Sequence, residues 1–238
     1  MKIKLFTIPN IVTLSNLTCG CLSIVSSLVY EDVQVAAALV VLAAVFDFFD
    51  GFTARLLKQY SEIGVQLDSL ADMVSFGVAP SMALYAVARS VESMYGLEGG
   101  FAEFLRCLPF LIAAFSALRL AKFNIDDTQH DTFCGLPTPG NAIFCISLAA
   151  LATMGKVSLT IEWIALISIL MSALLVSPIR MFSFKFKSFG LRENLLRYLF
   201  LLVSIILIIS IGIYSVPSII VLYVVVSAVQ WICFRSKE

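Results

Sequence analysis

The fold is decided by residues 33–72, which read VQVAAALVVLAAVFDFFDGFTARLLKQYSEIGVQLDSLAD. This stretch is apolar enough to enter a bilayer, yet it contains four aspartates. One carboxylate at the centre of a membrane helix costs about 2.5–3.5 kcal/mol, and four that faced lipid would cost on the order of 10 kcal/mol. We therefore expect the four side chains to face one another, a cavity or bound cations: Asp47, Asp50, Asp68 and Asp72.

The rest of the chain is equally apolar. Of its 238 residues 60% are hydrophobic and 13% are charged, whereas soluble domains have about 45–50% apolar and about 25% charged residues. Stretches long enough, or nearly so, to cross a hydrocarbon core of ~30 Å occur at residues 10–30, 33–57, 67–89, 104–123, 139–156, 160–177, 195–214 and 217–234. They predict an all-α fold, a polytopic membrane helical bundle of about eight transmembrane helices, preceded by an interfacial segment at residues 1–9.

Basic residues are divided unequally between the two ends of such a bundle. One set of loops holds Arg89, Arg106 and Lys156. The other holds the remaining 13 of the 16 (16 − 3 = 13): Lys2, Lys4, Arg55, Lys58, Arg119, Lys122, Arg180, Lys185, Lys187, Arg192, Arg197, Arg235 and Lys237. Because cytoplasmic loops carry the excess of Lys and Arg, we expect a multi-pass protein of the cell membrane with both termini and the aspartates on the cytoplasmic side.

Helical spacing predicts that the aspartates form two converging faces. At ~100° per residue, four residues of the second apolar stretch fall within an arc of roughly 100°: Asp47, Asp50, Gly51 and Ala54. On the next helix, which the spacing begins before residue 67, four residues share one face at the spacing i, i+4, i+8 and beyond: Gly64, Asp68, Asp72 and Ser75. A short turn around residues 60–63 makes the two helices antiparallel neighbours, so the carboxylates are expected to meet at one depth.

Carboxylates in that number are suited to hard divalent cations. Oxygen ligands favour Mg²⁺ or Mn²⁺, and zinc is disfavoured because Cys and His are lacking nearby and the one histidine, His130, cannot form a zinc site by itself. Two divalent cations about 3.5–4 Å apart are a recurrent arrangement for displacement at phosphorus. The small residues on the same faces leave room for a bulky ligand, and Arg55 beside them can pair with a phosphate. Because intramembrane carboxylates also form ion paths, a non-catalytic cation transporter stays an alternative.

The spacing of these residues resembles the signature of the CDP-alcohol phosphatidyltransferase family, D-x-x-D-G-x-x-A-R, eight residues, then G-x-x-x-D-x-x-x-D. Eight positions match without departure: Asp47, Asp50, Gly51, Ala54, Arg55, Gly64, Asp68 and Asp72. The family transfers a phosphatidyl group from a CDP-linked lipid to an alcohol and releases CMP. The resemblance implies a homodimer and two divalent cations, Mg²⁺ or Mn²⁺. It also implies that the four aspartates bind these cations and that Asp72 is the catalytic base.

An amino-terminal Pro-Asn-x-x-Thr pattern of the same family occurs as Pro9-Asn10-Ile-Val-Thr13, and it suggests that Asn10 and Thr13 help to hold the nucleotide diphosphate. The resemblance therefore implies a CDP-lipid site made of Asn10, Thr13, Asp50, Gly51, Ala54, Arg55, Gly64 and Asp68. It covers roughly residues 8–145 of one expected domain, residues 1–238, whose helices at 160–234 add little beyond hydropathy.

Three further stretches resemble the integral-membrane phosphatidylserine synthases of that family, at residues 75–81, 118–124 and 133–140. They imply CDP-diacylglycerol and L-serine as substrates. Membrane lipids are the expected partners, and nucleic acid is not one. We expect Arg119 to pair with the serine carboxylate, while Asn124 or Asp126 accepts from the ammonium. Arg119 can equally be an ordinary basic residue at a cytoplasmic helix end, and acceptors such as glycerol 3-phosphate or an inositol compound remain the alternative.

Two cytoplasmic segments each have two interpretations. Thr138 followed by Pro139 fits an N-cap and a first helical residue, so residues 124–140 form either a helix start alone or also a wall of the active site. Residues 182–189 alternate aromatic with basic side chains, which suits either anchoring to anionic headgroups or substrate binding.

Overall fold

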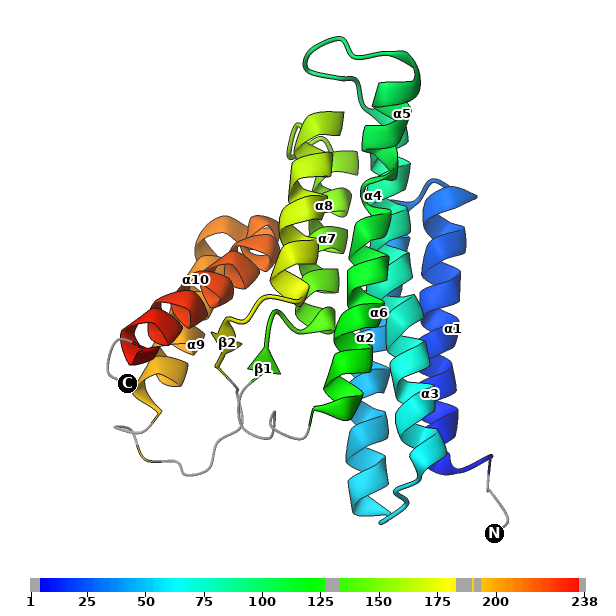
Figure 1. Ribbon diagram of the computed structural model, residues 1–238, viewed down its shortest axis with the longest axis vertical. Helices are drawn as coiled ribbons and strands as arrows, with labels where there is room; N and C mark the ends of the chain where they lie inside the picture. Colours follow the sequence, from blue (N-terminus) through cyan, green and yellow to red (C-terminus); the bar gives the residue numbers. More distant parts are fainter. Residues whose placement is uncertain (1–4, 127–132, 183–189, 191–193, 236–238) are drawn as a thin grey trace.

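The computed structural model describes residues 5–126, 133–182, 190 and 194–235. It is a bundle of helices with one short pair of antiparallel strands, β1 (Phe133–Cys134) and β2 (Arg180–Met181) (Figure 1). The predicted all-α membrane bundle is confirmed. The predictions for residues 1–4 of the interfacial segment, for His130 and for residues 183–189 lie outside the described residues.

The helices follow the predicted apolar stretches. Within the described residues they are α1 (Ile8–Leu28), α2 (Val33–Leu56), α3 (Glu62–Asp72), the π-helical η1 (Met73–Val78), α4 (Ala79–Ser90), α5 (Gly99–Cys107), α6 (Phe110–Ile125), α7 (Thr138–Thr153), α8 (Ile161–Leu175), α9 (Leu195–Ile211), the 3₁₀ turn η2 (Gly212–Tyr214) and α10 (Ser215–Arg235). Five continuous helical segments of this described part are long and apolar enough to cross a membrane: Ile8–Leu28, Val33–Leu56, Glu62–Ser90, Gly99–Ile125 and Leu195–Cys233. Helices α7 and α8 are shorter and apolar.

The third segment begins five residues before the predicted boundary (67 − 62 = 5). Ser61 is its N-cap, and the Ser61 hydroxyl accepts a hydrogen bond from the Gly64 amide at 3.1 Å. This cap satisfies one of the amides that a helix start leaves without a partner. The connection from α2 is therefore the short segment 57–61, and α2 and α3 are sequential neighbours at the lower end of the bundle (Figure 1).

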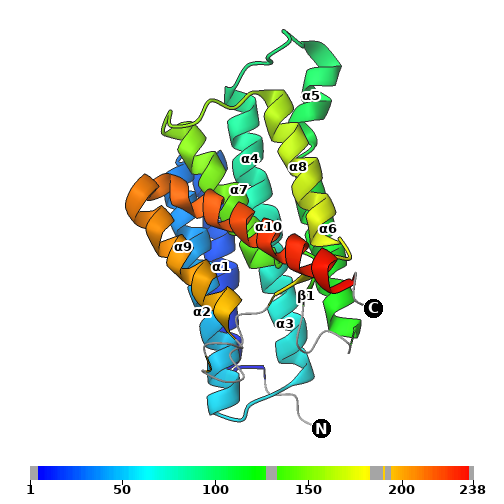
Figure 2. The same ribbon diagram turned by 90° about the vertical axis from the view of Figure 1, so that its left-hand side faces the viewer.

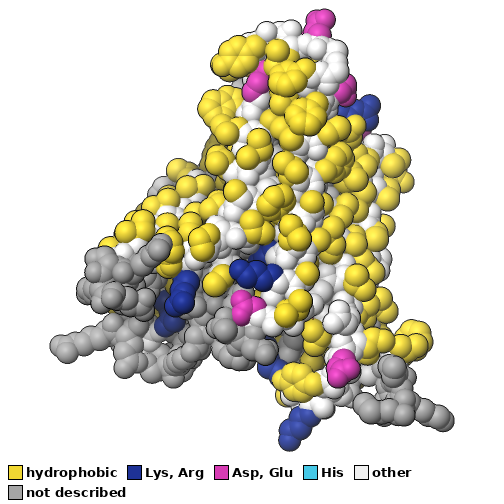
Figure 3. All heavy atoms as spheres, viewed as in Figure 1, with side chains coloured by type: hydrophobic (Ala, Val, Ile, Leu, Met, Phe, Trp, Pro, Cys, Tyr) yellow, Lys and Arg dark blue, Asp and Glu magenta, His cyan; other side chains and the backbone are white. Residues whose placement is uncertain are grey.

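Helices α1 to α8 run along the long axis of the molecule, whereas α9 and α10 lie obliquely against one side of it (Figures 1 and 2). Helix α10 packs on α7, and the strand pair β1–β2 lies beside this junction. In Figure 3 hydrophobic side chains cover the flank of the bundle, and charged side chains gather at its upper end and along its lower part. This distribution is the one that a bilayer around the flank requires.

Close packing of α1 against its neighbours depends on small residues. A Cβ atom added at Gly20 would lie 2.4 Å from the Ser75 hydroxyl oxygen and 2.8 Å from the Ser75 Cα, so only glycine permits this approach of α1 to η1. Ser75 donates to the Asn16 carbonyl at 3.0 Å, and Ser23 donates to the Ala36 carbonyl of α2 at 2.9 Å. Small residues at helix contacts are typical of membrane bundles, where close approach supplies the packing energy.

The π-helical turn η1 follows directly after Asp72. Such turns insert an extra residue into the helical repeat and occur frequently at functional sites. The i, i+4, i+8 pattern therefore holds as far as Asp72, and Ser75 beyond it is fully buried against α1. The π-helical turn places Ser75 against α1 directly after the end of α3.

Candidate active site

Three of the four aspartates meet between α2 and α3. One carboxylate oxygen from each of Asp47, Asp50 and Asp68 lies within 4.8 Å of the other two. At that separation two ionised carboxylates repel by about 3 kcal/mol or more at an effective dielectric constant of about 20. The arrangement therefore requires protons or cations to be shared among the three groups.

Asp72 lies one helical turn beyond this group and is held by α1. Its Oδ1 accepts a hydrogen bond from Asn16 Nδ2 at 3.2 Å, and the Asp47 carboxyl is within hydrogen-bonding reach of the carboxyls of Asp72 and Asp68. Asn16 is fully buried, and 8% of Asp72 is exposed. The sequence analysis missed Asn16. Its signal is the three-residue spacing of Asn10, Thr13 and Asn16, which places three polar side chains on one side of α1.

Within the described residues the carboxylates accept hydrogen bonds from neutral donors and form no ion pair with a Lys or Arg side chain. Thr13 donates to Asp50 Oδ2 at 2.7 Å, and both side chains are buried. Asp68 Oδ1 is buried without a hydrogen-bond partner among the described residues. Among the described residues, the structure records an ion pair between Arg106 and Glu103 of α5, and neither residue belongs to the aspartate group. A hard cation with oxygen ligands fits this donor set, because it would satisfy the free oxygen and neutralise the carboxylates.

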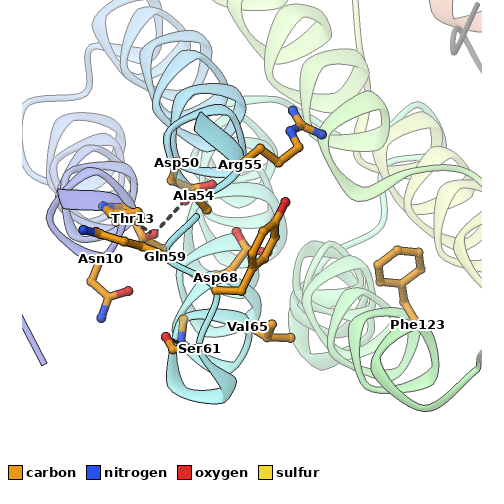
Figure 4. Close-up of a pocket in the computed structure, with 14 residues that line it drawn as sticks. Asn10, Thr13, Asp50, Ala54, Arg55, Gln59, Ser61, Val65, Asp68 and Phe123 are labelled. Atoms are coloured by element: carbon orange, nitrogen blue, oxygen red, sulfur yellow. Dashed lines mark hydrogen bonds between the residues drawn. The ribbon is translucent and has the colours of Figure 1, made fainter. Parts of the chain in front are cut away.

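A pocket of about 520 Å³ opens beside the aspartates between α1, α2, α3 and α6. All eight residues that the sequence analysis assigned to the CDP-lipid line it: Asn10, Thr13, Asp50, Gly51, Ala54, Arg55, Gly64 and Asp68. Figure 4 shows the Thr13–Asp50 hydrogen bond at its base and Phe123 of α6 on the opposite side. Gln59, Tyr60 and Ser61 of the α2–α3 connection also line the pocket, and the sequence pattern did not include them.

Two glycines in the pocket have different surroundings. A Cβ atom added at Gly51 would meet no atom within 4 Å, so the α2 backbone is open to the cavity there. A Cβ added at Gly64 would lie 3.3 Å from the Asn10 amide oxygen and 3.1 Å from the Ser61 hydroxyl, so Gly64 lets α3 approach the start of α1. The Asn10 side chain is fixed in turn by its hydrogen bond to the Leu5 carbonyl at 2.8 Å.

Arg119 is buried within the bundle. Only 8% of Arg119 is exposed, and its Nη1 donates to the Thr138 hydroxyl at 2.9 Å. Its Nε has no hydrogen-bond partner within the described chain, and its charge interacts with Asp72. The guanidinium carbon lies 5.8 Å from the ring centre of Phe123, which lines the pocket. The Arg119 side chain thus lies inside the bundle rather than at an exposed helix end.

Asn124 and Arg119 do not lie together. Asn124 is exposed and donates to the Ser69 hydroxyl of α3 at 2.9 Å. Five residues along a helix correspond to a rotation of about 140°, which turns the two α6 side chains to different sides. Asp126, the alternative to Asn124, is the C-cap residue of α6.

The start of α7 differs from the prediction. The N-cap is Pro137, and Thr138 is the first helical residue, so the expectation that Thr138 caps the helix is wrong. Its hydroxyl accepts from Arg119 instead, which links this segment to the site. One turn further along α7, Asn141 is fully buried, and neither its amide nitrogen nor its amide oxygen has a partner among the described residues. The sequence analysis missed Asn141.

Comparisons with known proteins give matches to one family. The family model described as CDP-alcohol phosphatidyltransferase matches residues 6–174. The chain is similar to the CDP-diacylglycerol–serine O-phosphatidyltransferase of Bacillus subtilis, with 42% identity over 132 residues that cover 56% of this chain and 69% of the relative. It is also similar to the protein of that name from Helicobacter pylori strain J99, with 30% identity over 98% of this chain and 94% of the relative. The protein of that name from Methanocaldococcus jannaschii is 31% identical over 74% of each chain.

Proposed function

Because the chain belongs to the CDP-alcohol phosphatidyltransferase family, we propose that it transfers the phosphatidyl group of CDP-diacylglycerol to the hydroxyl of L-serine and releases CMP. The observation that carries the proposal is the group of aspartates, which form no ion pair within the described residues, beside a pocket of about 520 Å³. Similarity to relatives named for CDP-diacylglycerol and serine supports the choice of substrates.

Asp47, Asp50, Asp68 and Asp72 would hold two divalent cations, Mg²⁺ or Mn²⁺. The family is metal-dependent, and the free buried oxygen of Asp68 together with the close carboxylates of Asp47 and Asp50 fits a hard cation. When bound, such cations polarise phosphoryl oxygens and neutralise the charge of a leaving phosphate.

The pocket would bind the CDP-lipid head. Arg55 at its edge can pair with phosphate oxygens, and the open backbone at Gly51 admits a bulky group. Asn10 and Thr13 contribute polar groups from α1, and Ala54 and Gly64 contribute little bulk. We assign the whole chain to one domain, residues 1–238, in which residues 8–145 carry these groups.

Asp72 is suited to accept the proton of the serine hydroxyl. Its carboxylate is fixed by Asn16 and lies next to Asp47, outside the residues that line the pocket. The serine oxygen attacks the phosphorus that carries diacylglycerol, the bond from that phosphorus to the bridging oxygen of CMP breaks, and CMP leaves with the electron pair. The hydroxyl proton passes to Asp72 and then to solvent.

Arg119 would bind the serine carboxylate. The guanidinium is buried near Asp72 and has donors left after its bond to Thr138, and a planar carboxylate accepts two parallel hydrogen bonds from such a group. Asn124, exposed at the end of α6, would act at the entrance of the site rather than beside Arg119.

For the whole molecule we propose a multi-pass protein of the cell membrane, with both termini and the site on the cytoplasmic side, because 13 of the 16 basic residues belong to that set of loops. CDP-diacylglycerol then enters from the surrounding lipid and serine from the cytosol. We also propose the homodimer that the family resemblance implies.

The test is an acceptor comparison with the purified chain in detergent. CMP release from CDP-diacylglycerol is measured with serine, glycerol 3-phosphate or inositol, each with Mn²⁺ and with Mg²⁺. We expect turnover with serine and little with the other two. Turnover with glycerol 3-phosphate and none with serine would keep the family chemistry and remove the serine assignment.

A further inference from the structure

Two contacts fix the register of α6 against the helix that carries Asp68 and Asp72. Asn124, near the end of α6, donates to the Ser69 hydroxyl at 2.9 Å. About two turns earlier, Ser116 lies so close to η1 that a Cβ atom added at Gly77 would be 3.1 Å from the Ser116 Cβ. The two helical segments run in opposite directions, so residues 116–124 of α6 lie along residues 69–77 (Figure 1).

This register places Arg119 and Asp72 at nearly the same height. The residue numbers of both contacting pairs add up to 193, so Asp72 lies level with Ala121 of α6 (193 − 72 = 121). Arg119 precedes Ala121 by two residues, which is about 3 Å along a helix axis. The two groups to which we assign the acceptor side of the reaction therefore lie where α6 meets the end of α3.

Helix α7 joins this place through Thr138. Nη1 of Arg119 donates to the Thr138 hydroxyl at 2.9 Å, and both side chains are buried. Asn141 lies one turn further along α7 in the same buried stripe. Side chains three residues apart on a helix are neighbours, with Cβ atoms about 5–6 Å apart. Asn141 is therefore the next buried polar side chain above the Arg119–Thr138 hydrogen bond.

The amide of Asn141 is fully buried, and neither Nδ2 nor Oδ1 has a partner among the described residues. Ser116, one turn before Arg119 in the buried stripe of α6, is also fully buried, with no partner for its hydroxyl in the same part of the chain. Because α6 and α7 run in opposite directions, both side chains lie on one side of the Arg119–Thr138 hydrogen bond (Figure 1). Unpaired buried amides destabilise a fold and are rare in native proteins, so this pair of groups points to a polar ligand.

The chemistry of an amide indicates the class of that ligand. Nδ2 donates and Oδ1 accepts, so one amide can bind a carboxylate and an ammonium of the same molecule. An acceptor recognised through a phosphate would leave Oδ1 facing an anion. The guanidinium of Arg119 lies one turn away and has Nε unpaired within the described chain, so it can share the carboxylate with Nδ2.

We propose that Asn141 is a specificity-determining residue, whose Oδ1 accepts a hydrogen bond from the ammonium of an amino-acid acceptor while its Nδ2 donates to the carboxylate. Solvent does not reach the amide, so the bound acceptor displaces the side chains that cover it. The assignment rests on the proposed function, since it concerns the acceptor side of the same reaction.

The substitution Asn141→Leu tests the assignment, because leucine is similar in size and has no polar side-chain atoms. Steady-state kinetics are measured with serine and with 3-hydroxypropionate, which keeps the hydroxyl and the carboxylate of serine but lacks the ammonium. We expect the preference for serine over 3-hydroxypropionate to fall about tenfold, the size of effect that loss of a hydrogen bond to a charged group produces. The KM for CDP-diacylglycerol should stay within about twofold of the unsubstituted chain.

Thermal unfolding in detergent, without acceptor, gives a second readout. The midpoint of Asn141→Leu should equal or exceed that of the unsubstituted chain, because an unpaired amide is removed and no hydrogen bond is lost. Asn194→Leu is the matched control. Asn194 is 1% exposed, but its Nδ2 donates to the Gly190 carbonyl at 3.1 Å and its Oδ1 accepts from Arg197. This variant should have a lower midpoint and an unchanged preference for serine.

An unchanged preference in folded Asn141→Leu, or a fall of equal size with both acceptors, overturns the assignment. A midpoint that falls as far as that of Asn194→Leu also overturns it, because the amide would then be paired inside the fold. Asn141→Ala, judged by the same preference, replaces Asn141→Leu if the latter does not fold. Failure of the proposed function gives a different result, since the unsubstituted chain would then not use serine at all.

Discussion

Asp72 differs from the other three aspartates in its partners. One carboxylate oxygen from each of Asp47, Asp50 and Asp68 lies within 4.8 Å of the other two, whereas Asp72 accepts a hydrogen bond from Asn16 of α1. An amide donor orients a carboxylate without neutralising it. Under the proposed function, these partners suit Asp72 to receive the proton of the acceptor hydroxyl.

Asp72→Asn should lower the rate of CMP release at least about 100-fold, because general-base catalysis contributes about 10²–10⁴. Binding of CDP-diacylglycerol should largely survive, since Asp72 does not line the pocket. Binding and turnover are measured separately on the same preparation. Asp32→Asn is the control: it is the same chemical change at the N-cap of α2, where Asn caps as well as Asp. Full activity of Asp72→Asn would remove Asp72 from the role of base.

Gly51→Leu should leave the fold intact and weaken substrate binding. A Cβ at Gly51 meets no atom within 4 Å, so the larger side chain extends into the pocket rather than into the core. We expect the KM for CDP-diacylglycerol to rise at least about tenfold, with a thermal unfolding midpoint close to that of the original chain. Gly100→Leu on α5, where a Cβ also meets nothing, should change neither quantity. An unchanged KM for Gly51→Leu would show that the nucleotide–lipid binds elsewhere.

At the scale of the elements, helical spacing is sufficient to predict that Asp47, Asp50 and Asp68 meet, because they lie on antiparallel neighbours joined by a short turn. It is not sufficient for the contact of Asn16 with Asp72. That contact depends on the close approach of α1 to η1 at Gly20, and neither the π-helical turn nor the approach has a local sequence signal.

The start of α7 shows the same limit. A Thr-Pro pair predicts an N-cap from local preference, but a buried arginine from another helix takes the threonine hydroxyl. Tertiary contacts therefore override the capping preference at Thr138. Nothing in the sequence near Thr138 indicates which residue of α6 reaches it.

Gly135→Ala should destabilise the fold strongly. Gly135 has φ +81°, and a Cβ there would lie 2.3 Å from the Leu175 carbonyl oxygen at the end of α8. Its amide also donates to the Ile179 carbonyl at 2.9 Å, so the segment cannot move away without losing this bond. The measurement is the thermal unfolding midpoint in detergent.

Gly96→Ala is the matched control for Gly135→Ala. Gly96 has φ +64° with no atom near the added Cβ, so only the left-handed conformation is penalised, by about 1–2 kcal/mol. The midpoint should fall clearly further for Gly135→Ala than for Gly96→Ala. Equal shifts would mean that the contact with α8 is not tight.

At the scale of the whole molecule, hydropathy locates the helices, but it does not show how α9 and α10 pack against the rest of the bundle. Helices α9 and α10 are mostly apolar in sequence, and their few polar residues do not indicate which helix of the bundle they pack on. Helix α10 packs on α7 and β2, α9 packs on α10, and both helices lie obliquely to the bundle (Figure 2).

The orientation in the membrane has its own test. Alkaline phosphatase, which is active only outside the cytoplasm, is fused after Gln59, after Leu97 or at the carboxyl terminus. The division of basic residues predicts activity for the fusion after Leu97 and none for the other two. Activity after Gln59 would place the aspartates on the opposite side, away from cytosolic serine.

The central claim is that the aspartate group, with divalent cations, joins serine to the lipid and releases CMP. The most direct measurement follows both products of the purified chain together, as CMP and as labelled serine that has become lipid-soluble. We expect one CMP per lipid-linked serine, loss of both products on chelation, and recovery of both when Mn²⁺ or Mg²⁺ is restored. Undiminished formation of both products in the presence of chelator, or release of CMP without lipid-linked serine, would contradict it.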